Sequence, residues 1–192
     1  MIRAAVRLLL LLGWRLQVEG RARVPSGPVI VVANHESLLD AIVLGCALPR
    51  PARFLAKLDL FRGPLGVVLR ALGAIPVARG RGDRGAVEAG IAALAAGDAV
   101  ALFPQGTVLG PPDRPWLRGA ARLALATGAP VLPVHLDGTA KALRPGTRLP
   151  RPTRLQVTIG DPVVVTPAPV SIAAARELTE RLREAVDALR PA

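Results

Sequence analysis

The sequence predicts an α/β fold: a single domain with a mixed, largely parallel central sheet flanked by helices, plus an N-terminal membrane-interfacial helix. After the turn-forming residues 25–28, short runs rich in β-branched residues alternate with helical stretches, which is typical of this class. Polar residues follow several predicted strands, where parallel sheets form their binding crevices. The 192 residues fit one domain that can bury a continuous core.

The first half of the domain predicts three strands and two helices. In chain order these are strand 29–33, helix 37–48, strand 53–56, helix 64–72 and strand 75–78. Residues 29–33 are uniformly apolar, as in a strand buried on both faces. Pro64 is favoured in the first turn of a helix. Lys57 and Arg79 follow the ends of their strands, so both are expected at the edge of the sheet.

The second half continues the alternation. It predicts a helix capped by Asp83 and stopped by Gly97, strand 99–103, helix 117–127, strand 130–136, a surface loop over 141–154, and one or two strands within 155–165. Ser171 can cap a last amphipathic helix, which has leucines on one side and charged residues on the other. We expect that helix to pack on the sheet without a catalytic role.

Residues 1–17 are predicted to form an amphipathic helix that is separate from the domain of residues 18–192. The apolar run of residues 4–14 is interrupted by Arg7 and is shorter than the ~20 residues that a membrane-spanning helix needs. Arginines beside leucines and Trp14 favour a helix in the headgroup zone of a bilayer. The alternative is a helix that packs on the core.

Composition narrows the classes of function. The net charge is +11, but the arginines are scattered and aromatic residues make up only 3%, which argues against nucleic acid and favours an anionic lipid surface. Cys46 is the only cysteine, so no internal disulfide forms. Two histidines and one cysteine make a poor metal set, and no metal is expected. The sequence has neither a Gly-x-Ser-x-Gly motif nor a phosphate-binding glycine loop.

His35 and Asp40 are the best candidates for chemistry. They directly follow the predicted central strand, at the end where a buried strand delivers side chains to an open edge. If Asn34 or Ser37 caps the next helix, Asp40 lies one turn inside that helix and can reach back to His35. A histidine near its ordinary pKa of ~6.5 can accept a proton from a hydroxyl when a carboxylate orients it. The alternative is a merely polar start to the helix.

Four blocks in order give this pair a context. They are residues 34–40, Gly73-Ala74-Ile75-Pro76-Val77-Ala78-Arg79, Phe103-Pro104-Gln105-Gly106-Thr107 and Val131-Leu132-Pro133-Val134. In this order and spacing the chain resembles the glycerolipid acyltransferase family, with its His-x4-Asp motif, from about Val18 to about Gly138.

The resemblance implies transfer of a fatty acyl group from a thioester to a hydroxyl on a glycerol backbone. His35 would be the general base and Asp40 its orienting partner. Lys57, Arg79, Gln105, Gly106 and Thr107 would bind substrate. No cofactor is implied beyond acyl-CoA or acyl-ACP as the co-substrate. The implied partners are a lysophospholipid, the membrane surface and, as one alternative donor, acyl carrier protein. The expected location is the cytoplasmic face of the cell membrane, as a peripheral or monotopic protein.

One block departs from the family pattern, in which the third block usually reads Phe-Pro-Glu-Gly-Thr-Arg. Gln105 replaces the glutamate and Val108 replaces the arginine, so one expected phosphate-binding cation is missing. Either another arginine replaces it, or the acceptor differs from lysophosphatidate. A catalytically silent lipid-binding protein is the rival from another class.

Overall fold

The computed structural model describes residues 2–71, 73–77, 84–109, 114–147 and 149–191. Within these residues one mixed sheet runs in the order β1-β7-β6-β2-β5-β3-β4. Its strands are β1 (Gln17–Glu19), β2 (Val29–Ala33), β3 (Ala52–Lys57), β4 (Ile75–Val77), β5 (Ala99–Leu102), β6 (Val131–Asp137) and β7 (Gln156–Ile159). All neighbours pair in parallel except β6 and β7, which are antiparallel. The predicted largely parallel sheet is therefore confirmed.

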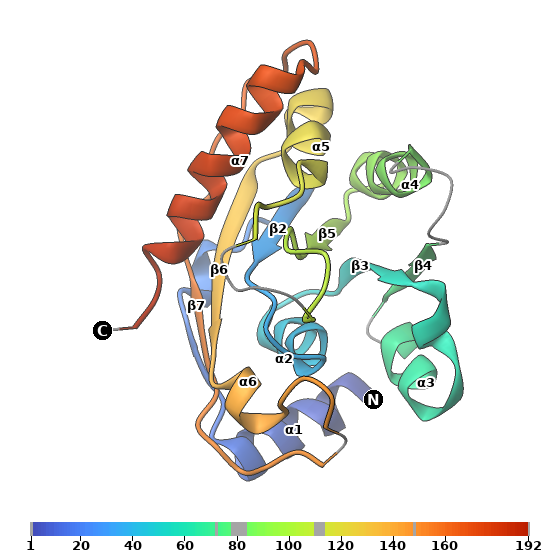
Figure 1. Cartoon of the computed structure of the whole chain (residues 1–192), viewed down its shortest axis with the longest axis vertical. Coiled ribbons are helices and arrows are strands. Elements are labelled where there is room, and N and C mark those ends of the chain that lie inside the picture. The colour runs from blue at the N-terminus through green and yellow to red at the C-terminus, as the bar shows by residue number, and fades with distance from the viewer. Residues whose placement is uncertain (1, 72, 78–83, 110–113, 148, 192) are drawn as a thin grey trace.

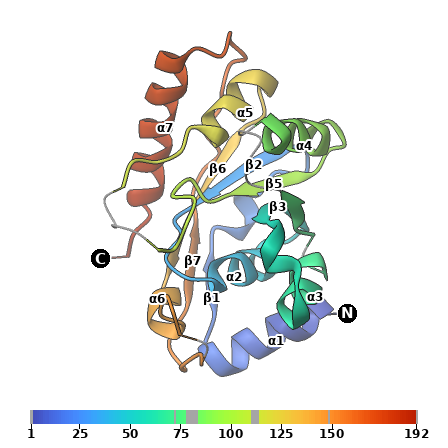
Figure 2. The ribbon, with the colours of Figure 1, turned by 45° about the vertical axis from the view of Figure 1, so that its right-hand side comes forward.

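Helices cover both faces of the sheet (Figures 1 and 2). They are α1 (Ile2–Trp14), α2 (Leu39–Ala47), α3 (Gly63–Ala71), α4 (Arg84–Ala95), α5 (Gly119–Thr127), α6 (Thr139–Ala142) and α7 (Ile172–Asp187). Strand β2 is buried throughout and divides the core. Val29, Val31 and Ala33 pack with α1, α2 and α3, whereas Ile30 and Val32 pack with α4, α5 and α7. Each such buried aliphatic side chain contributes about 1.5–3 kcal/mol, so β2 is a firm base for the residues that follow it.

Most predicted elements are present with boundaries shifted by one or two residues. Helix α2 begins at Leu39 rather than residue 37, because the residues before it form a turn around Asp40. Ser171 caps α7 as predicted, since its Oγ accepts a hydrogen bond from the N–H of Ala174 at 3.0 Å. The predicted cap at Asp83 and the last residue of strand 75–78 lie outside the described residues.

Of the strands and α-helices given above, β1 and α6 were not predicted. Strand β1 is three residues long, too short to show an alternating pattern, and pairs with β7 from the far end of the chain. Helix α6 takes up the start of the predicted loop 141–154 and is only one turn long. Within the predicted strand region 155–165 the structure has β7 and an isolated bridge between Val131 and Val163.

Helix α1 packs on the core by one side and leaves leucines exposed on the other. Leu10 is buried, and Val6 and Trp14 pack against the core beside it. The exposed residues, which we call the leucine face, are Leu8, Leu9, Leu11 and Leu12, with exposures of 40–76%. In the described part of the chain, every helix falls short of the length and apolarity that crossing a membrane would require.

Candidate active site

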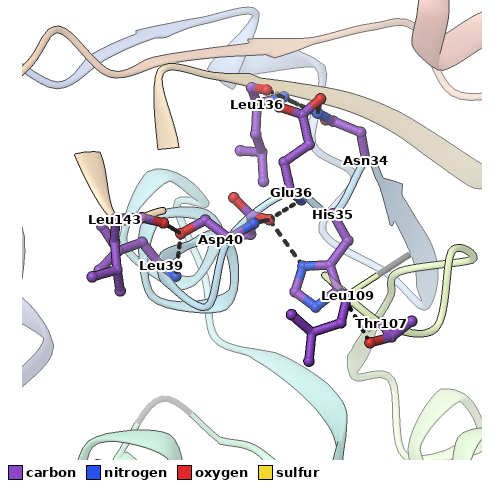
Figure 3. A network of polar contacts seen from close by, with 10 residues as sticks. Asn34, His35, Glu36, Leu39, Asp40, Thr107, Leu109, Leu136 and Leu143 are labelled. Atoms are coloured by element: carbon purple, nitrogen blue, oxygen red, sulfur yellow. Dashed lines mark hydrogen bonds and ion pairs between the residues drawn. The ribbon is translucent and has the colours of Figure 1, made fainter. Parts of the chain in front are cut away.

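The site is built on the turn between β2 and α2, residues 34–40, which we call the His35 turn. It leaves the sheet at the carboxyl end of β2, the end where parallel strands form crevices. Figure 3 shows the His35 ring directed toward the Asp40 carboxylate. The two groups are joined by a contact of 2.9 Å between Nδ1 and Oδ2. The predicted pair is therefore brought together.

The Asp40 carboxylate is buried, and one of its oxygens, Oδ2, makes three polar contacts. Besides His35, its Oδ2 accepts hydrogen bonds from the backbone N–H groups of Glu36 at 2.7 Å and Ser37 at 2.8 Å. Because a carboxylate accepts hydrogen bonds, this contact fits the tautomer of His35 in which Nδ1 carries the proton and Nε2 carries the lone pair. The ring keeps 16% of its side-chain surface exposed, so it remains open to a reactant.

An aromatic stack joins the His35 turn to the third sequence block. The rings of His35 and Phe103 are stacked with centroids 4.3 Å apart and an interplanar angle of 19°. Phe54 of β3 lies next, with its centroid 6.3 Å from that of Phe103. Phe103 follows the end of β5, so residues 103–107 begin directly beside the candidate base.

Residues 104–107 form a tight turn with polar groups. The N–H of Gly106 donates to the Phe103 carbonyl at 2.9 Å, and its φ of 71° is a left-handed conformation that favours glycine. A Cβ there would lie 2.7 Å from Leu117 Cδ1. The side-chain oxygen of Gln105 is buried without a hydrogen-bond partner in the described structure. Thr107 Oγ1 accepts from the N–H of Leu109 at 3.1 Å.

The two cation candidates are described only in part. Lys57 ends β3, with its backbone in register with Val77 at the end of β4, so it lies at the predicted edge of the sheet. The Lys57 side chain and the whole of Arg79 lie outside the described residues. Their substrate-binding roles therefore stay predictions.

Two further residues hold the His35 turn and were not recognised from the sequence as anchors. Asn34 is buried and bonds both backbone groups of Leu136, donating at 2.9 Å and accepting at 2.7 Å. The Ser37 hydroxyl donates to the Leu143 carbonyl at 2.8 Å and accepts from the N–H of Leu39 at 3.2 Å. The polar pattern of the turn was visible, but partners more than 100 residues away were not. Neither predicted cap is the N-cap of α2, which is Leu38 and makes no side-chain cap bond, although the Ser37 hydroxyl accepts from the N–H of Leu39 in the first turn.

The second histidine is placed differently. His135 is buried within β6, and its Nδ1 has no hydrogen-bond partner in the described structure. Burial, assisted by the charge of Arg190, holds the pKa of His135 below its ordinary value of 6.5. The lowered pKa favours the neutral form of the ring, and the structural role of His135 stays a prediction. Among the described residues, no group of three or more His, Cys, Asp or Glu side chains could hold a metal ion.

Several known proteins are similar to this chain in sequence and in fold. Residues 15–137 match the family described as Acyltransferase. A 1-acyl-sn-glycerol-3-phosphate acyltransferase of Bacillus subtilis is 29% identical over 83% of this chain and 79% of its own length. The protein of that name from Borreliella burgdorferi is 34% identical over 72% of this chain, which spans 58% of that relative.

The fold comparison agrees with the sequence comparison. The crystal structure of the 1-acyl-sn-glycerophosphate acyltransferase of Thermotoga maritima superposes with a TM-score of 0.73 and 27% identity. The similarity covers all of this chain and 80% of the Thermotoga chain. The region matched by the family, residues 15–137, contains the His35 turn, the Phe103 block and strands β1 to β6. This chain, an enzyme of the O-acyltransferase class, belongs to the acyltransferase family.

Proposed function

We propose that the protein transfers a fatty acyl group from acyl-CoA or acyl-ACP to the hydroxyl of a lysophospholipid such as 1-acylglycerol-3-phosphate. The observation that carries this proposal is the 2.9 Å contact between His35 and the buried Asp40 carboxylate at the carboxyl end of β2. The same carboxylate oxygen also accepts two backbone hydrogen bonds. The names of the relatives from Bacillus subtilis and Borreliella burgdorferi support the substrate class.

In the proposed reaction His35 Nε2 accepts the proton of the acceptor hydroxyl as that oxygen attacks the thioester carbonyl. The tetrahedral intermediate then expels the thiolate, which takes up the proton from the imidazolium, so the products are an ester and a free thiol. Asp40 stabilises the imidazolium and keeps Nδ1 protonated throughout. The acyl group passes directly from the sulfur of the donor to the oxygen of the acceptor, with no covalent enzyme intermediate.

The acceptor headgroup would be bound by the second and third sequence blocks. We assign Lys57 and Arg79 to its phosphate because a planar guanidinium can hold two phosphate oxygens, while an ammonium adds a point charge. Gln105, Gly106 and Thr107 would line the same pocket, since Phe103 places their turn next to His35. The uncharged Gln105 and the aliphatic Val108 favour a second candidate, an acceptor other than lysophosphatidate.

We expect the purified protein to release thiol from acyl-CoA with several lyso-lipids as acceptors. Lysophosphatidate should not stand out as the single best acceptor. Val108→Arg should raise kcat/KM for lysophosphatidate by about tenfold, because a hydrogen bond to a charged group contributes ~1.5–3 kcal/mol before solvent screening. A thiol-release assay with a panel of lyso-lipids measures both.

The matched control for this gain is Val108→Gln, which adds a long polar side chain without charge and should leave the preference unchanged. Added salt should weaken the gain of Val108→Arg, because screening acts on charge pairs at exposed sites. A wild type that uses lysophosphatidate far better than every other acceptor would refute the shift. Equal gains in both variants would refute the role of charge.

We further propose that α1 and the segment beside it lie on the cytoplasmic surface of the cell membrane. The leucine face offers apolar area, and Arg15 exposes its side chain beyond the helix. The Trp14 indole donates to the Arg151 carbonyl at 2.7 Å, which ties α1 to a loop carrying the exposed arginines Arg144, Arg151 and Arg154. Apolar area next to cations fits an anionic headgroup layer. An acidic acyl carrier protein would bind the cations without needing the leucines.

The double variant Leu8→Asn/Leu12→Asn is expected to weaken binding to phosphatidylglycerol-containing vesicles by tenfold or more, because two exposed leucines about one turn apart on α1 are lost. Co-sedimentation with vesicles checks this. Ile172→Asn is the control, since Ile172 is also exposed but begins α7, away from α1 in Figure 1. Unchanged vesicle binding by the double variant would exclude the leucine face as the contact.

A further inference from the structure

We propose that the segment from Leu136 to Leu143 is a positioning frame for the His35 turn, and that Asn34 and Ser37 are the positioning residues that connect the two. The inference rests on the proposed function, because it concerns how the proposed base is held. Asn34 and Ser37 flank His35 on either side along the chain. Each makes hydrogen bonds to a different end of the same segment.

The first connection continues the β-sheet with a side chain. Backbone pairing between β2 and β6 ends at Ala33 and Val134, where β2 leaves the sheet. The Asn34 amide then bonds both the N–H and the C=O of Leu136, at 2.7 and 2.9 Å. The position of Leu136 thus fixes the residue directly before His35.

The second connection joins the far side of the turn to the end of α6. Ser37 is fully buried, and its hydroxyl donates to the Leu143 carbonyl at 2.8 Å. Its backbone N–H bonds the same Asp40 oxygen that contacts His35. Any shift of Ser37 therefore moves the carboxylate that orients the base. Figure 3 shows Asp40 with Leu143 on one side and the His35 ring on the other.

The frame is itself held in place. Gly138, with φ 84°, is the N-cap residue of α6, and a Cβ at this position would lie 2.1 Å from the Arg154 carbonyl oxygen. The N–H of Leu143 bonds Thr139 at 2.8 Å, and Ala142 accepts from the N–H of Arg151 at 2.7 Å. The match to the acyltransferase family ends at residue 137, so the Leu143 anchor lies beyond it. A displacement of about 1 Å in such a site can cost ~100-fold in rate.

Ser37→Ala removes the hydroxyl connection and is expected to lower kcat by about 10–100-fold while KM for donor and acceptor changes less than threefold. Ser37→Thr keeps a hydroxyl and should recover most of kcat. Ser171→Ala is the matched control, because it removes a serine hydroxyl that caps α7 and should leave kcat unchanged. Asn34→Asp is the second variant, since an ionised carboxylate accepts from the Leu136 N–H but cannot donate to its C=O.

A measurement without substrate separates this inference from the proposed function. The chain has two histidines, so a histidine-labelled protein gives two sets of ring NMR signals. Ser37→Ala should move the His35 ring signals and leave those of His135 in place, and Ser37→Thr should restore them. A wild type inactive with every donor would overturn the proposed function, while the His35 signals would still test the frame. Unmoved His35 signals, or a kcat within twofold of wild type in both Ser37→Ala and Asn34→Asp, would overturn the frame.

Discussion

His35→Ala is expected to lower the rate of thiol release from acyl-CoA by about 10²–10⁴-fold, because positioned proton transfer is typically worth that much. The loss should fall on kcat, since the imidazole acts on the hydroxyl proton in the transition state and makes little contribution to ground-state binding. The ring stacks on Phe103, but it keeps part of its surface exposed, so the variant should fold. Thiol release under saturating acceptor is the measurement.

The control for this experiment is the other histidine. His135→Gln changes a buried ring on β6 that the proposed reaction does not use, and its kcat should stay near that of wild type. A far-ultraviolet circular dichroism spectrum of each variant shows whether the fold is kept. Equal rates for wild type and His35→Ala would contradict the proposed base and favour the catalytically silent lipid-binding protein.

The sheet and the contact between His35 and Asp40 could be predicted because the decisive signals are local. Residues 29–33 are all apolar, so the sequence itself indicates a strand that is buried on both faces, as the structure shows. His35 and Asp40 are five residues apart across a helix start, so their contact depends on a single turn. The Ser171 cap and the apolar side of α7 are local in the same sense.

The remaining features depend on contacts between distant segments. Strand β1 forms because Gln17–Glu19 pair with residues 156–158 of β7, and a segment of three residues carries no signal for so distant a partner. Asn34 and Ser37 find their partners 102 and 106 residues away. The stacking of His35 on Phe103 follows from the order β2-β5-β3 in the sheet, which single-strand patterns do not encode. The sequence therefore identified the candidate pair His35 and Asp40, and the tertiary structure was needed to find the residues that contact its turn.

Two variants of Asp40 should separate the proposed orientation of the base from the hydrogen bonds that hold the His35 turn. Asp40→Asn keeps an oxygen that can accept from the N–H groups of Glu36 and Ser37 but removes the charge that stabilises the imidazolium. We expect kcat to fall by about 10²–10⁴-fold with little loss of stability. Asp40→Ala should lose a similar amount of activity and also ~1–3 kcal/mol of unfolding free energy, because buried N–H groups lose their acceptor.

Combining these variants with His35→Ala gives the sharper result. If Asp40 acts through His35, removing the carboxylate from a protein without the imidazole should cost little further activity, so the losses should be far from additive. The losses of unfolding free energy in the two single variants should sum approximately to the loss in the double variant, since the backbone hydrogen bonds to Asp40 do not need the ring. Each Asp40 variant gives one double-mutant cycle, and thiol-release kinetics and urea unfolding on the four proteins of each cycle measure both quantities. Fully additive activity losses would mean that Asp40 serves catalysis by a route independent of His35, and the 2.9 Å contact would then be structural only.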